Sequence, residues 1–159
     1  LSPEVKISLK ENQILFADDD ATLISRLVDG EYPQYEKIIP DSNEIKIVVD
    51  SEKISGSLRR VSLFSNPKNR LLRVDVKSDG MRVSAKSPEL GEAFETLDIS
   101  SANGEIDIGF DAQYIKDALA HITPGEILLE FKDALSAVTL RPVESEDHLC
   151  LIMPMRLDA

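Results

Sequence analysis

The sequence EIKIVVDSEKISGSLRRV at residues 44–61 recurs without a gap as EIDIGFDAQYIKDALAHI at residues 105–122, with six identical positions. In each copy an alternating strand pattern ends at an aspartate, Asp50 or Asp111, that can cap the N-terminus of a helix. Each copy therefore predicts a strand followed by an amphipathic helix. Apolar residues recur at the i, i+4 and i+7 spacing of one helix face, and they are Ile54, Leu58 and Val61 in the first copy and Ile115, Leu119 and Ile122 in the second.

The segments after the two predicted helices also correspond. Each carries three strand patterns separated by turn residues, which fall at residues 71–76, 81–85 and 93–99 in the first copy and 127–131, 135–140 and 148–153 in the second. Residues 37–157 thus predict one α+β domain, a duplicated βαβββ unit with two helices packed on antiparallel sheets. A period of about 60 residues that occurs twice indicates a duplicated half-domain, because solenoids stack three or more repeats.

Residues 1–36 predict a separate unit and a connector. Strand alternation with turns at residues 10–12 and 17–20 predicts three short strands. No helix pattern is present to cover one face of these strands, so the chain is expected to begin inside a domain. Pro33 and Pro40 disfavour helix before them, which indicates an extended connector. Residues 158–159 are expected to be a short C-terminal extension.

Composition bounds the class of protein. The chain has 159 residues, a net charge of −11, 42% hydrophobic residues and one cysteine, Cys150. No apolar run approaches the roughly 18 residues that span a bilayer, and no signal-peptide pattern opens the chain, so a cytoplasmic protein is expected. The negative charge argues against a broad basic surface for nucleic acid, because such binding rests on Lys and Arg neutralising phosphates.

No catalytic motif is present. The sequence lacks a phosphate-binding loop, a dinucleotide glycine fingerprint and a nucleophile elbow, and it predicts neither a catalytic residue nor a cofactor. The acidic runs at residues 18–20 and 144–147 fit solvated turns, although oxygen ligands could also hold a hard cation. A small carboxylate-rich ligand- or metal-binding domain is therefore the alternative function, while the prediction for metal sites is none.

The two predicted helices carry some of the scarce positive charge. These residues are Lys53, Arg59 and Arg60 on the first helix and Lys116 on the second. A mixed, solvated helix face explains them. A weak track for phosphates is the alternative.

The last residues form a strand that breaks. Residues 149–157, LCLIMPMRL, begin as an apolar strand, and Pro154 cannot continue a central ladder. Met153 and Met155 could complete a core, or their flexible side chains could form a surface that accepts several apolar partners.

Three features together resemble the bacterial sliding clamp, the beta subunit of the replicative DNA polymerase III. They are the motif LVDGEYPQY at residues 27–35, the duplicated βαβββ unit and the ending MPMRL at residues 153–157. The family has three such domains per subunit, so the resemblance implies the last strands of the second domain in residues 1–36 and the whole third domain in residues 37–157. It implies a non-enzymatic processivity factor, in which a head-to-tail homodimer closes a ring around duplex DNA with helices lining the hole.

The resemblance also implies a peptide-binding cleft. The DNA polymerase III alpha subunit, clamp loader subunits, other polymerases and repair proteins dock there through a short motif with a glutamine and apolar residues. Lys37 stands where arginine is usual, and the second-domain wall of the cleft lies outside this sequence. Pro154 is expected to lift Met155 and Arg156 off the sheet onto the rim. The matching positions are Pro33, Lys37, Ile38, Tyr114, Leu135, Ala137, Leu151, Ile152, Met153, Pro154, Met155 and Arg156.

Overall fold

The computed structural model describes residues 4–32, 34–40 and 42–157. The chain divides into two compact units, Leu1–Gln34 and Tyr35–Ala159, and each is described by itself. Within the described residues no helix is both long and apolar enough to cross a membrane.

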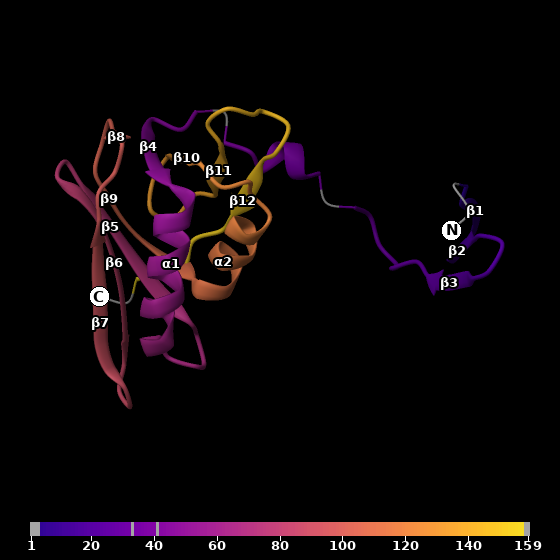
Figure 1. Ribbon diagram of the computed structural model, residues 1–159, viewed down its shortest axis with the longest axis horizontal. Coiled ribbons are helices and arrows are strands. Elements are labelled where there is room, and N and C mark those ends of the chain that lie inside the picture. The colour runs from indigo at the N-terminus through magenta and orange to yellow at the C-terminus, as the bar shows by residue number, and fades with distance from the viewer. Residues whose placement is uncertain (1–3, 33, 41, 158–159) are drawn as a thin grey trace. The chain divides into compact units, whose positions relative to one another are not determined.

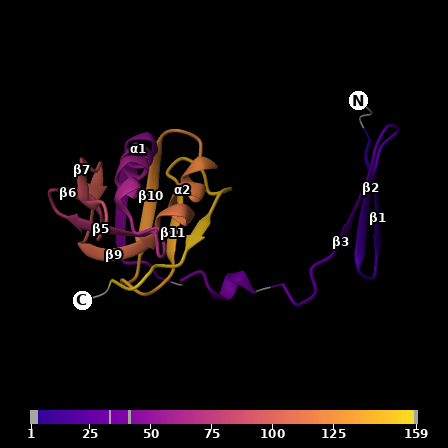
Figure 2. The ribbon, with the colours of Figure 1, turned by 90° about the horizontal axis from the view of Figure 1, so that it is seen from below.

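The first unit is an antiparallel meander of three strands, which confirms the three predicted strands. Its strands are β1 (Lys6–Lys10), β2 (Gln13–Ala17) and β3 (Thr22–Arg26), and they form the narrow ribbon seen in Figure 2. At the β2–β3 turn the Asp18 carboxylate accepts hydrogen bonds from the backbone N–H groups of Asp20 and Ala21, at 2.9 and 2.7 Å. These two bonds lower the pKa of Asp18 below its ordinary value.

The second unit contains both predicted βαβββ repeats (Figure 1). A 3-10 helix, η1 (Tyr35–Lys37), precedes them. The first repeat comprises β4 (Ile45–Asp50), α1 (Ser51–Val61), the 3-10 helix η2 (Ser62–Phe64), β5 (Leu71–Lys77), β6 (Gly80–Ser87), β7 (Gly91–Leu97) and the short β8 (Ser101–Ala102). The second comprises β9 (Ile106–Asp111), α2 (Ala112–Ala120), β10 (Glu126–Phe131), β11 (Val138–Pro142) and β12 (Cys150–Ile152).

Both predicted helix caps are confirmed. The Asp50 side chain accepts a hydrogen bond from the N–H of Lys53, and the Asp111 side chain accepts one from the N–H of Gln113. Each bond satisfies one of the backbone donors that the first turn of a helix leaves without an intrahelical partner. The duplicated sequence thus folds into duplicated local structure.

The first strand of each repeat lies in the sheet that the other repeat forms. One sheet has the order β12-β11-β10-β4-β8 and the other β7-β6-β5-β9. Asp50 at the end of β4 lies opposite Glu126, and Asp111 at the end of β9 lies opposite Leu71. The two exchanges lock the repeats together, so they form one domain with a single core.

The core lies between the helices and the two sheets. Figure 1 shows α1 and α2 side by side, and both pack against strands as well as each other. Ile54, Leu58, Val61, Ile115 and Leu119 are buried as their spacing predicted. Burying a Leu or Ile side chain contributes about 1.5–3 kcal/mol, so these stripes hold the helices in place.

Candidate docking site

The C-terminal segment leaves one sheet and joins the other. β12 pairs with β11, and beyond Pro154 the N–H of Met155 donates to the carbonyl oxygen of Gly109 in β9, at 2.8 Å. Met155 and Gly109 form an isolated antiparallel bridge. The expectation that Pro154 lifts Met155 off the sheet is therefore wrong in part, because the Met155 backbone finds a new partner at the edge of the second sheet. Arg156 is exposed.

A groove of about 450 Å³ lies where α2 meets β12. Its lining residues are Tyr114, Asp117 and Ala118 from α2, and Cys150, Leu151, Ile152 and Met153 from the C-terminal strand and its end. The Tyr114 and Met153 side chains are 61% and 59% exposed. The groove therefore presents an aromatic ring and a flexible thioether to solvent, which suits an apolar side chain of a partner.

A second groove of about 300 Å³ lies on the other side of Pro154 along the segment. Its lining residues are Asp107, Ile108 and Gly109 of β9, Ala134 and Leu135 of the β10–β11 loop, and Met155, Arg156 and Leu157 of the tail. Leu135 is 62% exposed. Apolar surface beside a cation suits a segment that has both an apolar and a polar side chain.

The loop that presents Leu135 is held by one carboxylate. Asp133 accepts hydrogen bonds from the N–H groups of Leu135 and Ser136, at 2.8 and 2.7 Å, and from the Ser136 hydroxyl at 2.9 Å. The bond from the Leu135 N–H is the largest of the causes that lower the pKa of Asp133. Asp133 therefore fixes the loop while it is ionised.

The other predicted cleft residues have different environments. Ala137 and Ile152 are only 6% and 4% exposed, so they support the surface more than they form it. Among the described residues, Lys37 and Ile38 line neither groove; Lys37 ends η1, and Ile38 is half-exposed. Pro33 lies outside the described residues.

Sequence reasoning did not identify several residues of the first groove. Asp117 and Ala118 follow Tyr114 at the i+3 and i+4 spacing, which places all three on one side of α2. That helical spacing was a usable signal. Cys150 also lines this groove, where burial raises the pKa of its thiol, and its Sγ lies 3.2 Å from His148 Nε2.

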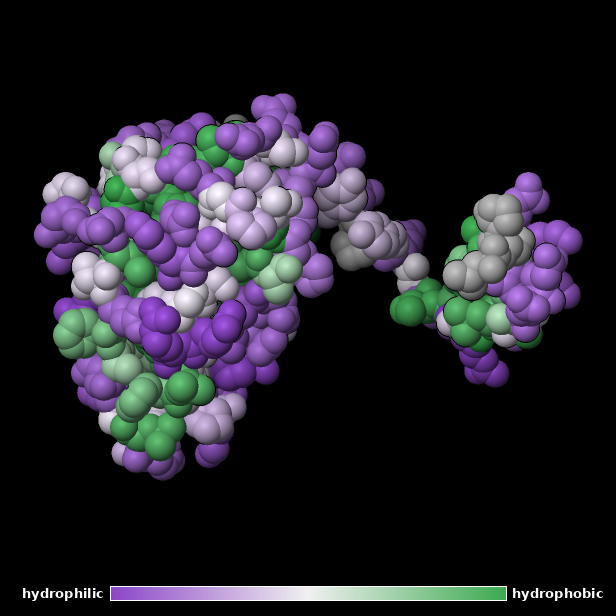
Figure 3. Space-filling view, viewed as in Figure 1, coloured by the Kyte–Doolittle hydropathy of each residue, from purple (hydrophilic) through white to green (hydrophobic). Residues whose placement is uncertain are grey.

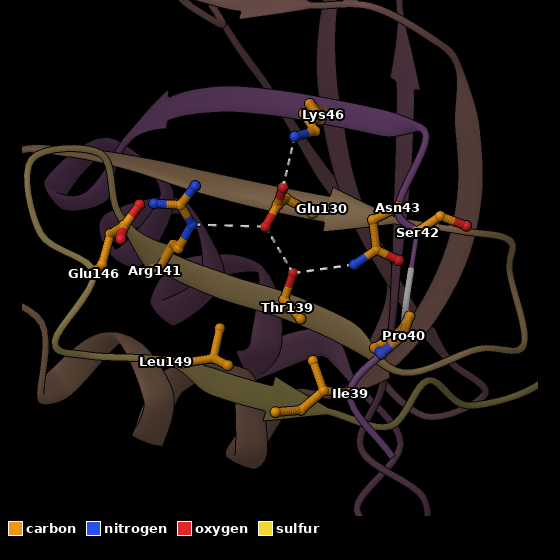
Figure 4. Close-up of a pocket in the computed structure, with 10 residues that line it drawn as sticks. All are labelled: Ile39, Pro40, Ser42, Asn43, Lys46, Glu130, Thr139, Arg141, Glu146 and Leu149. Carbon is orange, nitrogen blue, oxygen red and sulfur yellow. Dashed lines mark hydrogen bonds and ion pairs between the residues drawn. The ribbon is translucent and has the colours of Figure 1, made fainter. Parts of the chain in front are cut away.

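A polar pocket of about 480 Å³ lies over β4, β10 and β11 (Figure 4). Glu130 lies at its centre, where Lys46 Nζ is 3.1 Å from Oε1 and the Thr139 hydroxyl donates to Oε2 at 3.1 Å. The Asn43 amide nitrogen donates to that hydroxyl at 3.2 Å. Because these bonds link Asn43 to Thr139 and Glu130, the network ties the segment before β4 to the sheet.

The four predicted cationic residues of the helices differ in whether another side chain already pairs with them. The Arg60 guanidinium pairs with both carboxylate oxygens of Glu95, at 2.6 and 2.7 Å. Lys116 Nζ lies 3.3 Å from the Ser62 hydroxyl. Lys53 and Arg59 are exposed. The Arg60 guanidinium is thus already paired with a carboxylate, which its residue type alone did not indicate.

An apolar patch lies beyond the C-terminal end of α1, beside β7 (Figure 3). Leu63 of η2, which contacts β7, is 70% exposed, and its neighbour Phe64 is partly exposed. β7 is the terminal strand of its sheet. Apolar side chains beside a sheet edge are typical of a surface that another chain covers.

The metal-binding part of the carboxylate-rich alternative depends on clustered acidic side chains. Within the described ranges, no group of three or more His, Cys, Asp and Glu residues lies close enough to hold a metal ion. The Asp18 carboxylate is engaged by its own turn.

Comparison with known proteins gives consistent results. The model of the family "DNA polymerase III beta subunit, C-terminal domain" matches residues 36–156. The beta sliding clamp of Pseudomonas putida is 29% identical over 153 residues, which are 96% of this chain and 42% of the relative. The beta sliding clamp of Escherichia coli K12 is 28% identical with the same coverage. The chain thus spans about two fifths of the length of these curated relatives.

Solved structures agree. A sliding clamp from Pseudomonas aeruginosa bound to griselimycin superposes with a TM-score of 0.85 at 29% identity, over 96% of this chain and 42% of that one. The clamp from Bacillus subtilis gives the same TM-score and identity over 97% of this chain and 41% of that one. The α+β fold predicted from the duplication, with two helices on antiparallel sheets, is confirmed.

Proposed function

The chain belongs to the DNA polymerase III beta subunit family, and from this premise we propose that it is the C-terminal part of a sliding clamp. The whole protein would form a homodimeric ring around duplex DNA in the bacterial cytoplasm and would keep a polymerase on its template. The ring would also dock partner proteins, without catalysing a reaction. Residues 1–36 would be the last strands of the second domain and the connector, 37–157 the third domain, and 158–159 an extension.

The observation that carries this proposal is the pair of grooves along the C-terminal segment. Met153 faces one groove and Met155 the other, so a single extended peptide could place an apolar side chain in each. Backbone groups around Pro154 and the Arg156 guanidinium offer polar partners for a glutamine of that peptide. A peptide of the Gln-Leu-x-Leu-Phe type has this combination of side chains.

The partners of this site would be the proteins that carry such peptides. They are the DNA polymerase III alpha subunit, clamp loader subunits, other polymerases and repair proteins. Pro33, Lys37 and Ile38 would contribute from the connector, and Lys37 would contribute a point charge in place of the planar fork of an arginine. The second domain would supply the rest of the cleft.

The contact with DNA would be weak and topological. A net charge of −11 cannot support tight binding to phosphates over a large surface, but a closed ring is retained without such binding. Lys53, Arg59 and Lys116 on the helices would face the duplex, while Arg60 would contribute less because Glu95 holds its guanidinium.

The subunit contact of the ring would use the edge of β7. Leu63 and Phe64 lie beside this edge, and a strand from another subunit could extend the sheet while covering them. Replacing Leu63 by glutamate in the full-length protein should shift the dimer toward monomer in sedimentation experiments. A dimer of wild-type strength in that variant would place the subunit contact elsewhere.

The docking proposal is tested on the full-length protein with a fluorescein-labelled peptide containing Gln-Leu-Ser-Leu-Phe. Fluorescence anisotropy should show saturable binding, and deletion of residues 153–157 should abolish it. Circular dichroism of the deletion variant checks that the fold is retained. If the intact, folded protein does not bind the peptide, the assignment of the grooves is wrong.

A further inference from the structure

The C-terminal segment crosses β9 at Gly109, where there is no space for a side chain. A Cβ built on Gly109 would lie 2.6 Å from the Met155 carbonyl oxygen and 3.0 Å from both Leu157 Cδ2 and Leu71 Cδ1. Gly109 is buried, and it is not among the glycines with positive φ. The reason for glycine at this position is therefore space, because any L-residue could adopt its backbone conformation.

The other repeat provides an internal comparison. Val48 aligns with Gly109 in the duplicated sequence, and a crossing segment passes it as well, because the Ser100 N–H donates to the Val48 carbonyl oxygen at 2.8 Å. That crossing accommodates a valine side chain, and its residues Ser100 and Ser101 are exposed. In the second repeat Met155 and Leu157 are half-buried against β9. A hydrogen-bonded crossing thus exists in both repeats, although Val48 lies opposite Ser101 while Gly109 lies opposite Met155, the donor itself. At Gly109, a Cβ would overlap the backbone of the crossing segment that carries the docking residues.

From this difference we propose that Gly109 is a positioning residue for the docking site, a proposal that rests on the proposed function. By lacking a Cβ, Gly109 lets residues 154–157 lie against the β9 backbone. This contact fixes the height of Met155 and the direction of Met153 on the other side of Pro154. The two methionines are then held at a fixed separation before a docking peptide binds, so the site loses little conformational entropy on binding.

Replacing Gly109 by alanine should move Met155 away from β9. It leaves the other side chains that line the grooves chemically unchanged. To reach the 3.4 Å of ordinary contact from 2.6 Å, the Met155 carbonyl must move by about 0.8 Å. The obstacle is a backbone atom, so a rotamer change cannot relieve the overlap. The whole crossing must move away from β9, which lengthens the 2.8 Å hydrogen bond from the Met155 N–H to the Gly109 carbonyl.

The test uses Gly109→Ala in the full-length protein, with Gly104→Ala as the matched control. A Cβ on Gly104 would meet Ile45 Cγ1 at 3.0 Å, just after the equivalent crossing of the first repeat, so the control also introduces a tight contact near a crossing. Two quantities are measured, the Kd of the labelled Gln-Leu-Ser-Leu-Phe peptide and the hydrogen-exchange rate of the Met155 amide. Gly109→Ala is expected to weaken the peptide about tenfold and to speed the exchange, and Gly104→Ala is expected to change neither.

The outcomes separate this proposal from the proposed function. Wild-type affinity in folded Gly109→Ala, or equal weakening in Gly104→Ala, overturns the positioning role. If the wild-type protein itself fails to bind, the docking assignment fails, and the exchange rate of the Met155 amide still shows whether Gly109 holds the segment. If Gly109→Ala does not fold, Leu157→Ala leaves the β9 backbone intact and removes one contact of the crossing. It should then both speed Met155 exchange and weaken the peptide, and either effect without the other overturns the proposal.

Discussion

Replacing Thr139 by valine should destabilise the second unit by about 2 kcal/mol. Thr139 is 3% exposed, and its hydroxyl donates to Glu130 at 3.1 Å and accepts from Asn43 at 3.2 Å. A net contribution of about 1 kcal/mol for the neutral bond and about 1.5–2 kcal/mol for the bond to the carboxylate is typical. The additional buried methyl group of valine offsets about 0.8 kcal/mol of that loss.

Thr139→Ser is the control, because it keeps the hydroxyl and removes one buried methyl group, at a cost of about 1 kcal/mol. Urea denaturation followed by circular dichroism gives the free energy of unfolding, and an unchanged m-value confirms that the folded state is equally compact. The valine variant should also show faster amide exchange between η1 and β4, since Asn43 loses its link to the sheet. A valine variant as stable as the serine variant would refute the role assigned to the network in Figure 4.

Three further predictions concern the caps, the loop and the helices. Asp50→Ala should cost about 1 kcal/mol in urea denaturation, and Asp111→Ala should cost more because the Asp111 carboxylate also binds an arginine; equal losses would contradict this. The pKa of Asp133 is lower in the folded protein than its ordinary value of 3.8. The stability that Asp133 contributes should therefore be complete above pH 3.8 and be lost as the pH falls through the folded-state pKa. The free energies of unfolding of Asp133→Ala and wild type should thus converge in acid. In the full-length ring, Arg59→Ala should weaken low-salt binding to duplex DNA more than Arg60→Ala does; the reverse order would show that the Arg60 ion pair opens on DNA.

The sequence predicted local structure well and strand partners poorly. Asp50 and Asp111 cap their helices as expected, because a cap depends on residues within one turn. The exchange of β4 and β9 between the repeats could not be predicted, since alternation identifies the buried face of a strand but not its neighbour. Charge had the same limit. The sequence alone suggests that Arg60 is available for phosphates, because its partner Glu95 is distant in sequence.

The same limit explains what was missed at the C-terminus. β12 ends at Ile152, before Pro154, and the sequence does not indicate that Met155 pairs with the edge of the other sheet, because its partner Gly109 is distant in sequence. The aligned repeats place Val48 opposite Gly109, but this difference has a physical explanation only in the structure, where the Met155 carbonyl oxygen lies 2.6 Å from the position of a Cβ on Gly109. A duplicated domain makes such contrasts informative, because one copy shows what the fold alone requires and the other shows what has been added. Here the first copy tolerates a valine, so the glycine of the second is explained by the position of the segment that carries Met153 and Met155, not by the fold.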